Sequence, residues 1–210
     1  MLNTVYDAII VISFIVMYKW LMRPQQGSSQ KIIDRSNFSK GKKIAFKIAL
    51  LLGFVIIDLI LTQNQFFMKL NESLGLSNAP QMSSKDISSA IKQRDLMTYI
   101  FLLISADILT PIWEEIAFRG VFYDFAKGTA KQFLGKRVIL YRVVVGILAV
   151  GNILFFAWGH ETIAMISASM CAIMTITLFE FTGSIAFGIA LHIIHNSTND
   201  LIVIFKSLFG

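Results

Sequence analysis

Long apolar stretches that carry almost no charge are the feature that most constrains what this chain can fold into. Hydrophobic residues make up 55% of its 210 residues and charged residues only 15%, whereas a soluble domain carries about 25% charged residues. Several stretches reach roughly 15 to 20 residues, the length that a helix needs to cross a bilayer. A soluble domain of this size has too little interior to bury so much apolar surface. The sequence therefore predicts a polytopic membrane protein.

Six apolar runs follow one another along the chain. Lys47 and Asp58 lie near the ends of the second run, where side chains can reach the membrane surface. The first run lacks the positive flank and the cleavage site of a signal peptide, so we expect a retained helix. We expect one integral-membrane domain over residues 1–210, an all-α bundle of about six spans with a polar intramembrane cavity. The runs cover residues 5–22, 44–61, a third from 96 into 111–120, and then 138–158, 162–181 and 184–205.

The basic residues indicate how this bundle lies in the membrane. The net charge is +6, and most Lys and Arg residues fall in the segments 23–43 and 119–137, which we interpret as loops. The positive-inside rule places both loops in the cytoplasm and the N-terminus outside. No arginine-rich stripe with interleaved aromatic residues is present, so nucleic acid is not an expected partner. The single cysteine, Cys171, lies in an apolar run and is expected to be a small buried side chain.

The third run contains two adjacent glutamates, and a carboxylate inside a membrane is energetically costly. Glu115 and Arg119 are spaced i, i+4, so they can form an ion pair on one helix face. Glu114 points about 100° away from Glu115 and stays free for chemistry. A charge cluster that simply ends the helix has the same pattern, so both interpretations remain open. Asp107 shares the face of Glu114, and we expect it to cap backbone that Pro111 leaves without a helix bond.

Histidines occur in two later regions. His160 follows the fourth run, where a lone histidine is more often interfacial than catalytic. The sixth run contains His192, His195, Asn196 and Asn199 at the spacing i, i+3, i+4, i+7, which forms a polar stripe on an apolar helix. Such a stripe can simply hold helices together. Two imidazoles and two amides at this depth nevertheless favour a functional site.

Together these residues include a buried acid, imidazoles and an amide, the groups that activate water and stabilise an oxyanion. No G-x-S-x-G serine motif is present, and Cys171 has no activating neighbour. Zinc stays chemically open, because one Glu and two His residues are acceptable ligands. The only His-Glu dipeptide, His160-Glu161, lacks the second histidine of H-E-x-x-H, since Ala164 occupies that position.

Three short motifs occur in order on successive apolar runs. Glu114-Glu115-Ile-Ala-Phe-Arg119 fits EExxxR, Phe156-Ala-Trp-Gly-His160 fits FxxxH, and His192-Ile-Ile-His-Asn196 fits HxxxN. This ordered set resembles the CPBP family of CAAX-processing and bacteriocin-processing membrane proteases, also called the Abi family. The resemblance covers about residues 96–201, which we expect to be the catalytic core.

The resemblance implies an intramembrane endopeptidase of the glutamate type that needs no metal and no cofactor. By this analogy Glu114 and His160 activate the attacking water, and His192 and Asn196 form the oxyanion site. His195 has no counterpart in the motifs, and we expect it to be structural. The supporting residues that the analogy implies are Glu115, Arg119 and Phe156.

One geometric difficulty follows from the expected spans. Counting along the runs places Glu114 near the cytoplasmic face and His160 near the outer face. The two side chains then meet only if the fourth run is bent, short or re-entrant. Gly146, Gly151 and Asn152 would allow a break in this run, because irregular backbone is tolerated in a membrane where it lines a polar cavity.

A membrane protease with a peptide or membrane-protein substrate is the leading hypothesis, and we expect it in a bacterial plasma membrane. Two alternatives stay open. A non-catalytic bacteriocin-immunity or scaffold protein would keep the site but act by binding a partner. A small proton-coupled transporter would relay protons through Asp107, Glu114 and the histidines. The sequence does not indicate the oligomeric state.

Overall fold

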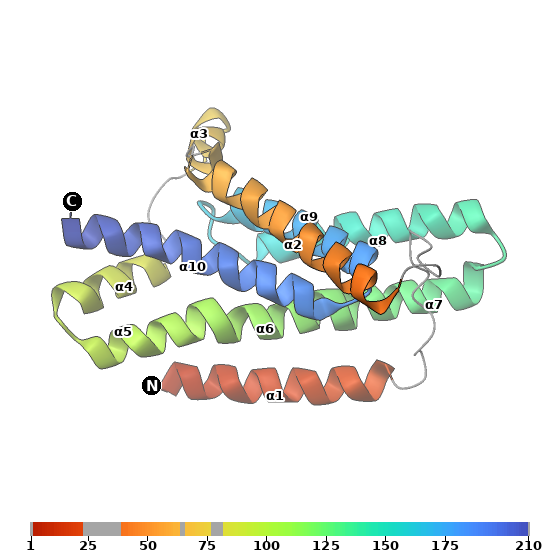
Figure 1. Cartoon of the computed structure of the whole chain (residues 1–210), viewed down its shortest axis with the longest axis horizontal. Helices are drawn as coiled ribbons and strands as arrows, with labels where there is room; N and C mark the ends of the chain where they lie inside the picture. Colours follow the sequence, from red (N-terminus) through yellow and green to blue (C-terminus); the bar gives the residue numbers. More distant parts are fainter. Residues whose placement is uncertain (1, 23–38, 64–65, 77–81, 210) are drawn as a thin grey trace.

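The computed structural model describes residues 2–22, 39–63, 66–76 and 82–209 (Figure 1). Within these ranges the regular structure is entirely helical, which confirms the all-α fold expected from the apolar runs. Four helices precede the family-like region: α1 (Leu2–Met22), α2 (Lys40–Gln63), α3 (Phe66–Ser73) and α4 (Met82–Lys92).

A continuous helical column then runs from Leu96 to Leu134. The Asp95 carboxylate caps its N-terminus by accepting hydrogen bonds from the amide of Thr98 at 3.1 Å and from the Thr98 hydroxyl at 2.7 Å. Two of its segments are π-helical, a rare geometry that is frequent at functional sites. The column consists of α5 (Leu96–Leu103), the π-helical η1 (Ile104–Leu109), α6 (Thr110–Glu115), the π-helical η2 (Ile116–Asp124) and α7 (Phe125–Leu134).

This column corrects the loop expected over residues 119–137. The helix continues to Leu134, and only residues 135–137 connect it to the next helix. Arg119 and Lys127 are buried inside the bundle. Glu114 therefore lies in the middle of the column, about 27 Å from its start at 1.5 Å per residue.

The next helix, α8 (Val138–Trp158), returns antiparallel to α7 and packs against α7 and η2. With 21 residues it is about 31 Å long, so it ends level with the centre of the column (Figure 1). Of the three alternatives for the fourth run, the structure shows the short one: α8 is one uninterrupted helix, without the break that Gly146, Gly151 and Asn152 would allow. His160 reaches the level of Glu114 because α8 is short relative to the column.

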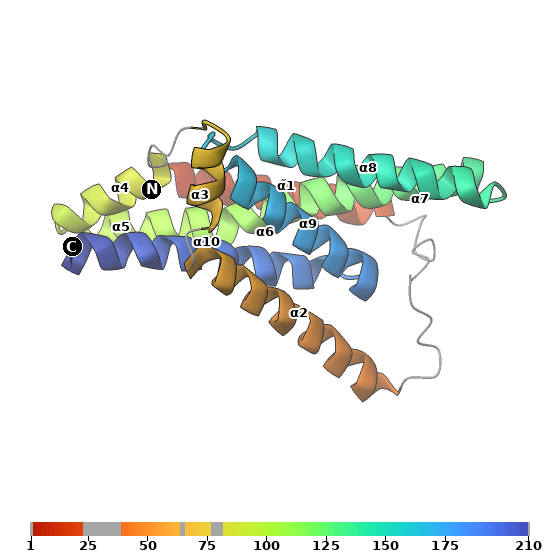
Figure 2. The same ribbon diagram turned by 90° about the horizontal axis from the view of Figure 1, so that it is seen from above.

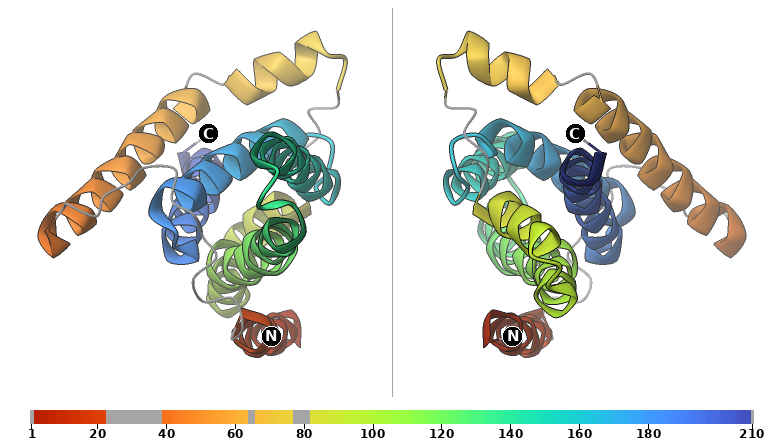
Figure 3. Two further views of the ribbon diagram at one scale, coloured as in Figure 1. Left: turned by 90° about the vertical axis from the view of Figure 1, so that its right-hand side faces the viewer. Right: turned by 90° about the vertical axis from the view of Figure 1, so that its left-hand side faces the viewer.

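The last two helices, α9 (Met165–Thr182) and α10 (Ile185–Phe209), pack against each other. Gly183 joins them with φ of 63°, a left-handed conformation that suits glycine. Viewed along the long axis, α1 and the α2–α3 pair lie on opposite sides of the bundle (Figure 3), and α2 leans away from the bundle at its Lys40 end (Figure 2). The core between α2, α9 and α10 contains Leu50, Leu51, Phe54, Val55, Met174, Leu178 and Leu191.

Four helical segments are long and apolar enough to cross a membrane: Lys40–Thr62, Leu96–Leu134, Val138–Trp158 and Met165–Thr182. The chain is an integral membrane protein by this composition, but the expected count of six spans is not confirmed. The C-terminal end of α1, the start of α2 and the α7–α8 connection lie at one end of the molecule, and α4 and the C-terminal end of α10 lie at the other (Figure 1). Most of the basic segment 23–43 lies outside the described residues.

Candidate active site

The glutamate pair ends α6, directly before the second π-helical segment. Glu115 and Arg119 are both fully buried, and the ion pair that their spacing predicts is present, with Arg119 Nε 3.2 Å from Glu115 Oε2. The Arg119 guanidinium lies 4.5 Å from the centre of the Phe156 ring, a cation–π contact. Glu114 is also buried, but it has no ion pair with an arginine of the described residues. Of the two carboxylates, Glu114 is therefore the one that arginine leaves available.

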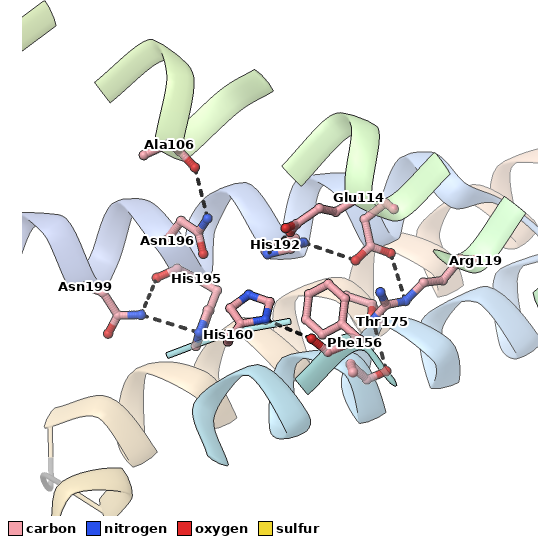
Figure 4. A network of polar contacts seen from close by, with 12 residues as sticks. Ala106, Glu114, Arg119, Phe156, His160, Thr175, His192, His195, Asn196 and Asn199 are labelled. Carbon is pink, nitrogen blue, oxygen red and sulfur yellow. Dashed lines mark hydrogen bonds and ion pairs between the residues drawn. The ribbon is translucent and has the colours of Figure 1, made fainter. Parts of the chain in front are cut away.

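His192 from α10 lies between the two glutamates (Figure 4). Its Nδ1 is 3.1 Å from Glu115 Oε1, and its Nε2 is 3.6 Å from Glu114 Oε2. Because a carboxylate can only accept here, the ring donates Nδ1–H to Glu115 and turns Nε2 toward Glu114. Gly188, one turn earlier on α10, makes room for this contact, since a Cβ there would lie 3.0 Å from Glu115 Oε2.

Phe156, near the end of α8, is the apolar centre of the cluster. Its ring centre lies 4.7 Å from that of His160 and 5.6 Å from that of His192, in addition to its contact with Arg119. The Phe156 carbonyl also accepts a hydrogen bond of 2.8 Å from His160 Nδ1. One residue of the FxxxH motif therefore contacts all three motifs and orients the imidazole of its own motif.

Asn196 lies one turn beyond His192 and donates an amide hydrogen to the Ala106 carbonyl at 3.0 Å (Figure 4). The Ala106 carbonyl has no backbone partner within its helix, and the sequence explains why. In η1 the amide of Thr110 bonds to the carbonyl of Ser105, five residues back. The corresponding partner of Ala106 is Pro111, which has no N–H.

This geometry corrects the expected role of Asp107. The π-helical register moves the unpartnered carbonyl from Asp107 to Ala106, and an amide from α10 caps it. The Asp107 carboxyl instead forms hydrogen bonds with Asp200 and Ser197 of α10. Asp107 therefore belongs to a second polar contact between η1 and α10, next to that of Asn196.

A further polar contact joins His195, which was expected to be structural, to Asp58, which was not expected at the site. His195 donates Nδ1–H to Asp58 Oδ1 at 2.8 Å, and both side chains are buried. Asn199 contacts His195 Nε2 at 3.4 Å and donates to its carbonyl at 3.0 Å. The sequence analysis placed Asp58 near the membrane surface, and the structure shows that it is fully buried. The sequence signal for this buried role was the position of Asp58 as a lone acid within an apolar run.

Burial sets the protonation state of His160, which lies just after α8. Desolvation lowers the pKa of His160 below its ordinary value of 6.5, and the nearby charges of His195 and Arg119 lower it further. The bond to the Phe156 carbonyl opposes this shift but does not outweigh it. His160 is therefore neutral at neutral pH, with the proton on Nδ1 and a basic Nε2.

A metal site is not apparent in the ranges that the structure describes, where no three His, Cys, Asp or Glu side chains are grouped to hold an ion. Metal independence stays a prediction, to be tested by chelation. The expected polar cavity stays a prediction as well.

Comparison with known proteins identifies the family. Residues 96–198 match the model of the Rce1-like family, described as type II CAAX prenyl endopeptidase Rce1-like. No curated protein and no solved structure matches the chain. The chain belongs to this family, within the CPBP proteases, which confirms the resemblance carried by the three motifs. The family is one of membrane CAAX-type endopeptidases, which supports a protease.

Proposed function

We propose that this protein is an intramembrane endopeptidase that hydrolyses a peptide bond with water activated by Glu114 and His160. The observation that carries the proposal is the meeting of motifs that are far apart in the chain. His192 contacts Glu115 although 77 residues separate them, and Phe156 contacts both His160 and His192. Buried ionisable groups in a membrane protein mark functional sites, and these groups suit acid–base hydrolysis.

Glu114 is the proposed general base. Its carboxylate is buried, and its Oε2 lies 3.6 Å from a ring nitrogen without a hydrogen bond of ordinary length. A water bound to Glu114 would lose a proton to the carboxylate as its oxygen attacks the substrate carbonyl. His160 assists through its basic Nε2, since its Nδ1 is held by the Phe156 carbonyl. The proton then passes to the leaving amine, so that the carboxylate is regenerated.

His192 and Asn196 are the proposed oxyanion donors. Glu115 holds Nδ1 of His192, so Nε2 is the ring edge that faces the reaction. The proton that Glu114 takes from the water can then be shared with Nε2, which makes this edge a donor to the tetrahedral oxyanion until the proton passes to the leaving amine. Asn196 has two amide hydrogens and uses one of them on Ala106, which leaves the second for the oxyanion.

The substrate in this proposal is a peptide or a membrane-associated protein. The site lies midway along the central column and not at either end, so the scissile bond has to enter the bilayer region. Localisation to a bacterial plasma membrane and the absence of a nucleic-acid partner are part of the same proposal.

A proton-coupled transporter is the second candidate, and one observation favours it. The hydrogen bonds of Asp107 with Asp200 and Ser197 extend the polar groups from the site toward the Leu96 end of the column. A transporter would acidify proteoliposomes when its solute is added, whereas a protease would not. A non-catalytic immunity or scaffold protein would keep its biological effect after Glu114→Gln.

The function is tested by comparing membrane peptides from cells that express the wild-type protein or Glu114→Gln at equal levels. Glu114→Gln keeps the shape of the side chain and removes the base. We expect peptides with new termini in the wild-type cells and their uncleaved precursors in the variant cells. Identical peptide sets in the two cell lines would argue against proteolysis and favour a binding role.

A further inference from the structure

The segment α2–α3, which precedes the family match at residues 96–198, makes three contacts with the part of the molecule that carries the histidines. Asp58 of α2 accepts a hydrogen bond from His195 across 137 residues of sequence. Phe67 of α3 packs edge-on against the same imidazole, with ring centres 6.5 Å apart. Asn71 of α3 donates a hydrogen bond of 2.9 Å to the Ile163 carbonyl, in the connection that carries His160.

These contacts are buried, although they come from a segment at the side of the bundle. Asp58 and Asn71 are both fully buried, and Phe67 is nearly so. Burial of a carboxylate or an amide is energetically costly unless the group forms a hydrogen bond with a partner. The side chains beside Asp58 on α2 are largely exposed and apolar, and those beside Asn71 on α3 are largely exposed. The two buried polar residues therefore serve the contact with the histidine-bearing elements and not the surface of the helices themselves.

We propose that Asp58 and Asn71 are positioning residues of the active site, with Asn71 fixing the connection that carries His160 and Asp58 holding His195 beside it. The predicted effect of these residues on catalysis rests on the proposed function, but their positioning of the histidines does not. It assigns a part of the site to α2 and α3, which carry none of the three motifs.

Asn71 acts on His160 through the backbone. The connection between α8 and α9 spans residues 159–164, and His160 is held within it by its own bond to the Phe156 carbonyl. Asn71 anchors the far side of the same connection at Ile163. Without the hydrogen bond from Asn71, the connection is held less firmly. The His160 imidazole then samples a wider range of positions.

Asp58 acts on His160 through His195. The two imidazoles lie on the same side of α10 (Figure 4) and interact electrostatically. Asp58 accepts the Nδ1–H of His195 and so fixes the tautomer and the position of that ring. The interaction with His195 lowers the pKa of His160, which keeps His160 neutral. Arg119 from η2 also acts on His160 and lowers its pKa, and Glu115 from α6 faces the third ring, His192.

The chain has only three histidines, which allows a direct test that needs no substrate. Protein labelled with carbon-13 at the imidazole Cε1 gives three resonances in detergent, assigned with His160→Gln, His192→Gln and His195→Gln. In the wild type, His160 should titrate with a midpoint below 6.5. We expect His195→Gln to raise this midpoint by about half a pH unit, and Asp58→Asn to shift the His160 resonance because it releases His195. Asn71→Ala should broaden or shift the His160 resonance.

Matched controls lie on the same helices. Thr62→Val is one turn along α2 from Asp58, and Ser73→Ala removes a hydroxyl on α3 that bonds only to the local Leu70 carbonyl. Both controls should leave the His160 resonance and its midpoint unchanged. Thermal unfolding in detergent checks that every variant is folded. If Asp58→Asn does not fold, His195→Gln removes the same pair from the other side, and Asp58→Asn/His195→Gln replaces it by a neutral pair.

Activity provides the second measurement. With a peptide identified as above, Asn71→Ala should lower kcat about 10-fold to 100-fold with little change in KM, as misplacement of a catalytic group does. Folded variants whose His160 resonance and midpoint match the wild type would overturn the proposal. A shifted His160 resonance in a protein that cleaves no peptide would instead sustain the positioning role and contradict the protease.

Discussion

Each of the three histidines has its Nδ1 held by an oxygen acceptor. His160 donates to the Phe156 carbonyl, His192 to the Glu115 carboxylate and His195 to the Asp58 carboxylate. An imidazole that donates from Nδ1 keeps its basic lone pair on Nε2. The fold therefore presets the same tautomer at all three rings. At His160 this leaves Nε2 available for the proposed water chemistry, and at His192 it leaves Nε2 able to take up the proton from Glu114 before it donates to the oxyanion.

The pH dependence of activity follows from His160. Because burial lowers its pKa below 6.5, the neutral, basic form persists at neutral and mildly acidic pH. The part of the acidic limb that belongs to His160 should therefore be centred below pH 6.5. A pH profile of kcat/KM measures this limb. His160→Gln should lower the rate and should remove this limb from the profile. An acidic limb centred above 6.5 that disappears in His160→Gln would contradict this assignment.

Gly188 sets how closely α10 approaches the glutamates. A Cβ at this position would lie 3.0 Å from Glu115 Oε2 and 3.7 Å from Thr175 Cβ, so Gly188→Ala should displace the carboxylate that holds His192. We expect a loss of about 1–3 kcal/mol in the free energy of unfolding, together with reduced turnover. Gly146→Ala on α8 is the matched control, since its Cβ would meet nothing within 4 Å. Equal stability and turnover in both variants would contradict the close packing.

At the scale of elements, a buried ion pair joins the column to α9. Lys127 of α7 pairs with Glu180 of α9, and both side chains are largely buried. Lys127→Met would leave Glu180 charged and unpaired, so we expect it to cost about 3–5 kcal/mol of stability. Replacing both partners, in Lys127→Met/Glu180→Leu, should recover most of this loss. Denaturation in mixed micelles measures both effects, and a double variant no more stable than Lys127→Met would contradict this interpretation.

Contacts within one helix could be predicted from the sequence. The Glu115–Arg119 ion pair follows directly from an i, i+4 spacing. The end of the third run could not be predicted in the same way, because Arg119 and Lys127 have the composition of a basic loop. Their partners, Glu115 and Glu180, become visible only once the helix is seen to continue.

Contacts between distant elements follow no spacing rule. Asp58 and His195 are 137 residues apart, and nothing periodic relates them. The capping of Ala106 by Asn196 depends on a π-helical register, which propensities do not reveal. The order of the three motifs predicted the family, while the relative lengths of α8 and the column determine how the motifs meet.

At the scale of the molecule, the fold predicts a topology that single cysteines can test. The start of α2 and the α7–α8 connection lie at one end, and α4 lies at the other (Figure 1). Cys171 is fully buried, so it should contribute little background labelling. Lys42→Cys and Lys136→Cys should react with an impermeant reagent from the cytoplasmic side, and Lys92→Cys from the outside. Labelling of Lys42→Cys and Lys136→Cys from opposite sides would contradict this arrangement.

The central claim is that the meeting of the three motifs produces hydrolysis through Glu114. The most direct test is cleavage of an identified peptide by purified protein in detergent, measured for the wild type and Glu114→Gln, with and without a strong chelator. We predict that the wild type cleaves at the same rate with the chelator and that folded Glu114→Gln does not cleave. Wild-type turnover by Glu114→Gln, or activity lost on chelation and restored by zinc, would contradict the account.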